Sequence, residues 1–267
     1  MKLLVLSFFP AFAPASSGGE LRLGNLYRSL SRIHDITLLT STDFDVRFEE
    51  ISHAPKFREL RFPKDHLWRK AYGTLQTAGM SGDLSGLAFA LAVSDPDCGL
   101  RRTARELAGS CDAVIHEFPY SEPIFSDGSA HCEIYNAHNF EAGLVAAIEH
   151  GPSLDRALLK VIRLERNLVM RVSRVFAPST NDLERFRMFY GVEPSKLALC
   201  PNGFDDRELD AARRTHQTDN RQSIERPRLL FTDRRIIPTW KRPISSWHWR
   251  RNCHIATYTS LAVLQGH

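Results

Sequence analysis

The sequence lacks several features that would assign it quickly. No apolar run approaches the roughly 20 residues of a membrane-spanning helix. There is no G-x-G-x-x-G fingerprint, and the five cysteines include no C-x-x-C pair. Zinc ribbons and disulfide-rich secreted domains are therefore disfavoured, and reduced thiols indicate a cytoplasmic protein. Cys111, Cys132 and Cys200 stand in apolar contexts, which predicts that they are small core residues.

Strong charge is also missing from most of the chain. The net charge is +4 over 267 residues. Residues 232–267 carry six Lys or Arg and one Asp, a net +5, so the remaining 231 residues balance at −1. The main body therefore lacks the basic surface of a nucleic-acid-binding protein.

The N-terminus has two interpretations. Lys2, the apolar run Leu3–Phe9 and the following Ala11-Phe12-Ala13 imitate a short secretory signal. The same run suits a first strand that is buried on both faces. An odd cysteine count fits secretion poorly, which favours the strand.

Strand-like and helix-like segments alternate along residues 1–208. Strands are predicted at 3–8, 36–39, 57–62, 113–116, 133–136, 175–177 and 197–199. Helices are predicted at 17–32, 66–78, 84–94, 101–108, 140–149, 153–174 and 179–190. This order predicts an α/β fold, a Rossmann-like parallel sheet with helices on both faces. Residues 209–227 have the composition of a linker, and 228–267 form an irregular tail that we expect to be poorly ordered.

Five short motifs in order make the first part of the chain recognisable. They are Ser17-Gly18-Gly19-Glu20-Leu21-Arg22, Ile134–Glu141, Leu164-Glu165-Arg166, Val175–Asp182, and Tyr190-Gly191-Val192 followed by Pro201–Asp205. Together they resemble the N-terminal, acceptor-side domain of family 4 glycosyltransferases of the GT-B fold. The resemblance implies transfer of a sugar to a sugar or lipid-linked acceptor. It implies a nucleotide-diphosphate sugar as co-substrate, with no metal ion and no other cofactor.

The donor half implied by this resemblance is not recognisable. Residues 228–267 hold neither the pair of spaced glutamates nor a diphosphate-binding motif, and the pattern is lost after Phe231. We expect a truncated or frame-shifted donor domain and a chain that is inactive alone. A second hypothesis is a non-catalytic acceptor-binding module that works with a separately encoded donor domain. A Rossmann oxidoreductase is disfavoured, because the glycine fingerprint is absent.

The candidate site residues follow predicted strands, at the sheet edge where open α/β folds bind ligands. The resemblance assigns His138 to the reaction cleft as the candidate catalytic residue. The candidates for contact with the acceptor or diphosphate are Gly18, Gly19, His116, Glu117, Asn139, Glu141, Ser179 and Asn202. Each has a structural alternative. The glycines suit a tight turn, Asn139, Glu141 and Ser179 suit helix caps, and Asn202 suits a hinge turn.

The predicted helix at 153–174 carries a basic stripe. Helical spacing places Arg156, Lys160, Arg163, Arg171 and Arg174 on one side. Such a stripe is either a solvated face or a peripheral contact with the anionic inner membrane surface, which would suit a lipid-linked acceptor.

Overall fold

The computed structural model describes residues 1–11, 17–148 and 154–203. All of them belong to one compact unit, Met1–Asp205. The predicted linker at 209–227 and the tail at 228–267 lie outside the described residues. Their assignments, including the truncated donor domain, stay predictions.

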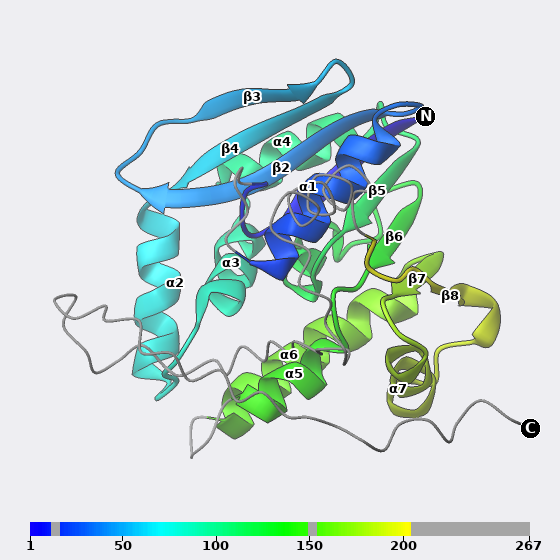
Figure 1. The fold of residues 1–267 in the computed structure, drawn as a ribbon. Helices are drawn as coiled ribbons and strands as arrows, with labels where there is room; N and C mark the ends of the chain where they lie inside the picture. Colours follow the sequence, from blue (N-terminus) through cyan, green and yellow to red (C-terminus); the bar gives the residue numbers. More distant parts are fainter. Residues whose placement is uncertain (12–16, 149–153, 204–267) are drawn as a thin grey trace, which may run out of the picture. The chain divides into compact units, whose positions relative to one another are not determined.

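Eight strands of the described residues form one sheet in the order β3-β4-β2-β1-β5-β6-β7-β8 (Figure 1). The strands are β1 (Lys2–Ser7), β2 (Asp35–Phe44), β3 (Glu49–Ala54), β4 (Phe57–Lys64), β5 (Ala113–His116), β6 (Glu133–Asn136), β7 (Arg174–Ala177) and β8 (Leu197–Leu199). All neighbours pair in parallel except β3, which runs antiparallel to β4. The predicted fold class is confirmed, with an antiparallel edge strand added.

Helices connect most of the parallel strands. They are α1 (Gly18–Leu30), α2 (His66–Thr77), α3 (Ser85–Ser94), α4 (Gly99–Ala108), α5 (Glu141–Ile148), α6 (Leu154–Arg171) and α7 (Thr180–Tyr190). Two short 3₁₀ helices, η1 (Pro119–Phe125) and η2 (Pro194–Lys196), complete the described elements.

The first strand shows how both faces of the sheet are buried. Leu3 and Val5 join a core cluster with the α1 side chains Leu23 and Tyr27. The alternate β1 positions face the larger cluster, to which α2, α3, α4, α6 and α7 contribute. Successive strand side chains point to opposite faces, so a continuous apolar run is what a sheet covered on both sides requires.

The structure corrects two of the predicted elements: one strand was not predicted, and one helix ends earlier than predicted. The strand Glu49–Ala54 was not predicted, because it is a partly exposed edge strand whose side chains form no continuous apolar run. The helix predicted to reach residue 174 ends at Arg171, and Arg174 begins β7.

The cysteine prediction is also corrected. Cys111, Cys132 and Cys200 are only half-buried, whereas Cys98, at the start of α4, is the fully buried thiol. Among the described residues, no helix combines the length and apolar character needed to cross a membrane.

Candidate functional site

The carboxyl ends of β1, β5, β6, β7 and β8 lie at one edge of the sheet, because these strands are parallel. Each strand is followed there by residues predicted to be functional, which are glycines after β1 and polar residues after the other four. This is the edge at which open α/β sheets bind ligands.

His138 and Glu117 form a buried pair at this edge. The His138 Nε2 atom lies 2.7 Å from Glu117 Oε2, and the two side chains are 6% and 0% exposed. Because an ionised carboxylate only accepts hydrogen bonds, Glu117 holds His138 in the tautomer with a proton on Nε2. The Nδ1 atom of His138 is then the nitrogen with a free lone pair.

The start of α1 lies against the free nitrogen of this histidine. Ser17 caps the helix by accepting a hydrogen bond from the Glu20 N–H at 3.2 Å. A Cβ atom added at Gly19 would lie 3.0 Å from the Phe9 ring and 3.6 Å from His138 Nδ1. Gly19 therefore permits the close approach of backbone and imidazole, and the partial positive charge of the helix end faces the site. Gly18 is exposed and an added Cβ would contact nothing there.

Two aromatic rings pack against His138. Its ring centroid is 4.3 Å from that of Phe118 and 6.4 Å from that of Phe9. These contacts and the carboxylate fix the imidazole in position and orientation.

A polar network continues from Glu117 across the sheet. Glu117 Oε1 accepts hydrogen bonds from the Tyr27 hydroxyl and, at 2.9 Å, from the Asn136 amide. Asn136 in turn accepts from Arg22 at 3.0 Å. Burial, followed by the charge of Glu117, raises the pKa of Tyr27 well above its ordinary value, so the phenol stays protonated as a donor.

Arg22 ties α1 to the loop after β8. Its guanidinium donates to the Cys200 carbonyl at 3.2 Å and to the Asn202 side chain. Asn202, predicted as a hinge residue, is therefore held at the same edge as His138. Arg22, Tyr27 and Asn136 were not predicted as site residues. Tyr27 could have been found, because it follows Leu23 by one turn on the buried face of the helix, where a tyrosine hydroxyl needs a partner.

His116 is not part of this group, although it precedes Glu117 directly. The strand alternation sends its side chain to the opposite face, where Nδ1 lies 2.7 Å from Ser121 Oγ and Nε2 lies 2.8 Å from Glu133. Burial lowers the pKa of His116 despite the opposing effect of Glu133. The position indicates a structural histidine under the site rather than a ligand contact.

Arg171 belongs to the same buried network as His116 and Glu133. It is therefore not part of an exposed basic stripe on the helix. It donates to Glu133 at 2.9 Å and to Glu122 at 2.8 Å. Burial raises the pKa of Glu133, but the hydrogen bonds from His116 and Arg171 outweigh it and hold that pKa below its ordinary value. Arg174 lies in β7, so three of the five residues of the predicted stripe are exposed residues of α6: Arg156, Lys160 and Arg163. The proposed membrane contact stays a prediction.

The remaining candidates lie on the rim. Ser179 caps α7 by accepting from the Asp182 N–H at 3.1 Å. Asn139 is half-buried beside His138 in sequence. The cap predicted for α5 is supplied neither by Asn139 nor by Glu141, but by the buried Glu165 of α6, which accepts from the Glu141 N–H at 2.9 Å.

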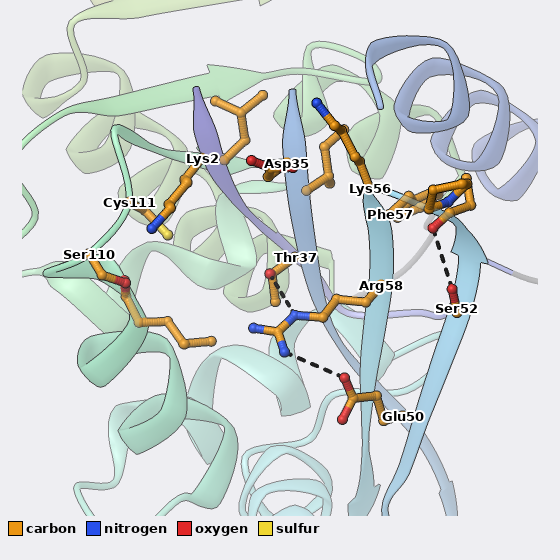
Figure 2. Close-up of a pocket in the computed structure, with 15 residues that line it drawn as sticks. Lys2, Asp35, Thr37, Glu50, Ser52, Lys56, Phe57, Arg58, Ser110 and Cys111 are labelled. Carbon is orange, nitrogen blue, oxygen red and sulfur yellow. Dashed lines mark hydrogen bonds and ion pairs between the residues drawn. The ribbon is translucent and has the colours of Figure 1, made fainter. Parts of the chain in front are cut away.

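A groove elsewhere on the sheet offers no comparable group of side chains in the part of the chain that the structure describes. A groove of about 480 Å³ lies at the opposite edge of the sheet, where β1, β2 and β4 begin (Figure 2). There Arg58 reaches Thr37 at 3.1 Å and Glu50 at 3.4 Å, so its charge is engaged within the sheet. Among the described residues, no cluster of three or more His, Cys, Asp or Glu is arranged to hold a metal ion.

The fold has solved relatives at low sequence identity. No protein-family model matches the chain, and no curated protein matches it. A UDP-forming α,α-trehalose-phosphate synthase from Burkholderia xenovorans aligns with a TM-score of 0.52 and 12% identity, over 82% of this chain and 51% of that chain. Sucrose-phosphate synthase from Thermosynechococcus elongatus aligns with a TM-score of 0.50 and 13% identity, over 80% and 52% respectively.

The fold is therefore that of one half of a GT-B glycosyltransferase. The chain spans about half the length of the solved proteins that it matches. The resemblance that the motifs predicted is confirmed at the level of fold.

Proposed function

We propose that the described unit is the acceptor-binding half of a family 4-like glycosyltransferase, which moves a sugar from a nucleotide-sugar donor to a sugar or lipid-linked acceptor. The observation that carries this proposal is the Glu117–His138 pair at the carboxyl edge of the sheet, facing the first turn of α1. A UDP-forming enzyme among the solved relatives supports a nucleotide-sugar donor.

In this proposal, His138 handles the acceptor hydroxyl. Its Nδ1 accepts a hydrogen bond from the hydroxyl and orients the oxygen toward the donor sugar. Glu117 holds the imidazole in the required tautomer, and its negative charge stabilises a proton that Nδ1 takes up. The helix end at Gly18 and Gly19 lies where the anionic leaving group would develop charge.

The donor would bind to a second half. Stabilising a departing diphosphate requires hydrogen-bond donors aimed at it from across the cleft, and the matched proteins are about twice as long as the matched region. We therefore assign binding of the acceptor, and not of the donor, to the described unit.

The test is an NMR titration of the full chain that follows the His138 ring signal. Candidate acceptors are a panel of glycosides and a short-chain polyprenol, compared with UDP-glucose and NAD. We expect an acceptor to shift the His138 signal and Glu117→Gln to weaken its binding at least tenfold. His131→Ala, at an exposed loop histidine, is the matched control and should change nothing.

Two outcomes would contradict the proposal. Binding of NAD at this edge would indicate an oxidoreductase instead. A His138 signal that responds to UDP-glucose but to no acceptor would indicate a donor-binding half.

A further inference from the structure

A second cavity shares a wall with the candidate site. It has a volume of about 220 Å³ and is lined by residues of α3, η1, α5 and α6 that belong to or pack against the larger core cluster. Phe118 and Phe8 line it, and the Phe118 ring also packs against His138, with 4.3 Å between the ring centroids. A molecule in the cavity would therefore lie one aromatic ring away from the imidazole.

The cavity wall is mainly apolar. Besides the aromatic rings, it is lined by the side chains of Leu84, Leu87, Leu144, Val145, Ala157 and Val161. Ser81, Asp83, Tyr120 and Glu141 supply its polar groups, and among the residues that the structure describes no Lys, Arg or His lines it. A dry cavity of about 150 Å³ holds a benzene ring, so this one has room for a substituted ring or a short alkyl chain.

Glu141 presents a carboxyl group to this cavity. The residue is 6% exposed, and its Oε1 accepts a hydrogen bond from the Tyr120 hydroxyl at 2.8 Å. Each carboxyl oxygen has two lone pairs, so Glu141 can accept a further hydrogen bond from a hydroxyl group of a ligand in the cavity.

The charges around the cavity discriminate against anions. Burial is the main reason that the pKa of Glu141 is raised to about 7; the charges of Glu165 and Asp83 act in the same direction, and the hydrogen bond from Tyr120 opposes them. The Glu141 carboxyl accepts a hydrogen bond from Tyr120, and none of the described lining residues is a cation, so Glu141 adds negative charge above neutral pH. A phosphate group in this cavity would meet carboxylates without a compensating cation from the described residues.

We propose that this cavity holds the apolar part of an uncharged acceptor, such as a hydroxylated ring or alkyl chain, and that Glu141 accepts a hydrogen bond from its hydroxyl. This inference rests on the proposed function, because it identifies the acceptor class. It excludes sugar phosphates from the cavity, although some solved relatives bear the names of sugar-phosphate synthases.

The test uses two probes that share one apolar body. Binding of 4-ethylphenol and of 4-ethylphenyl phosphate to the full chain is measured by ligand-observed NMR at pH 8. We expect 4-ethylphenol to bind at least tenfold more tightly than its phosphate. Glu141→Gln, which removes the charge but keeps the shape, should reduce that preference by at least threefold.

Variants that fill the cavity locate the probe. Leu144→Trp and Val145→Phe start from half-buried positions on α5, so a larger side chain can enter from the rim. Either should abolish binding of 4-ethylphenol. Leu159→Trp on the exposed side of α6 is the matched control and should leave binding unchanged.

The proposal is overturned by equal or tighter binding of the phosphate, by no binding of 4-ethylphenol at 10 mM, or by binding that survives both filling variants. His138→Ala should leave binding of 4-ethylphenol intact, since Glu141 and the apolar wall hold the probe. A cavity that binds the probe while His138 responds to no acceptor would refute the proposed function and leave the cavity assignment standing.

Discussion

Replacing Glu165 by glutamine should flatten the pH dependence of stability. Glu165 is fully buried in α6 and accepts four hydrogen bonds, from the hydroxyls of Tyr135 and Tyr190 and from two N–H groups at the start of α5. Burial is the main reason that its pKa is raised to about 7 from an ordinary value of 4.5. The folded protein therefore holds a proton on this carboxyl at a pH where the unfolded chain has released it.

The sign follows from proton linkage. A carboxyl whose pKa is raised by folding contributes its full stabilisation below pH 4.5 and loses it as the pH rises through about 7. At about 1.4 kcal/mol for each pKa unit, Glu165 should account for about 3 kcal/mol of lost stability between these limits. A glutamine cannot ionise, so this loss disappears, while a lost hydrogen bond lowers stability by roughly 1–3 kcal/mol at every pH.

The assay is urea unfolding of the full chain at pH 5, 7 and 8.5. As the pH rises from 5 to 8.5, the free energy of unfolding of the unchanged protein should fall by about 3 kcal/mol more than that of Glu165→Gln. Glu184→Gln is the matched control, because this side chain is 58% exposed and pairs only with Arg187. Parallel pH curves for the protein with and without Glu165 would refute the reasoning.

Three further predictions test the packing and the second buried network. Gly86→Ala should destabilise the protein by roughly 1–3 kcal/mol in urea unfolding, because the added Cβ would lie 2.4 Å from the Tyr120 ring. Gly73→Ala is the control: this helix position is open, so the substitution should stabilise the protein by up to about 1 kcal/mol. Arg171→Met should cost roughly 3–5 kcal/mol, since two buried carboxylates lose their cation, and an unchanged unfolding midpoint would refute that. In an NMR titration, His116 should protonate below the ordinary histidine pKa because burial disfavours its cation.

The fold was predictable because its signals are local. Apolar runs marked the buried strands, and the capping residue Ser17 marked the start of α1 where the structure has it. Gly191, predicted to end α7, has a φ of 67°, which favours glycine. The antiparallel strand Glu49–Ala54 escaped prediction, because an edge strand needs no continuous apolar run.

The site was predictable by position but not by partner. Strand ends placed His138, Glu117 and Asn202 at one edge, and the structure has them there. The sequence contained no indication that Glu117 pairs with His138, or that Arg22 bridges helix and loop over 178 residues of chain. Such pairings depend on strand order and register, which single motifs do not encode.

The neighbours His116 and Glu117 show why position alone is insufficient. His116 is the last residue of β5 and Glu117 follows it, and both are fully buried. His116 hydrogen-bonds Glu133 on one face of the sheet, whereas Glu117 holds His138. Two adjacent polar residues at a strand end must point to opposite faces. Gly19, at the start of α1, lies close to His138, the partner of Glu117. Glu117, and not His116, can therefore orient an imidazole toward a ligand at that helix end. The same constraint means that exchanging the two side chains would destroy both networks rather than move the site.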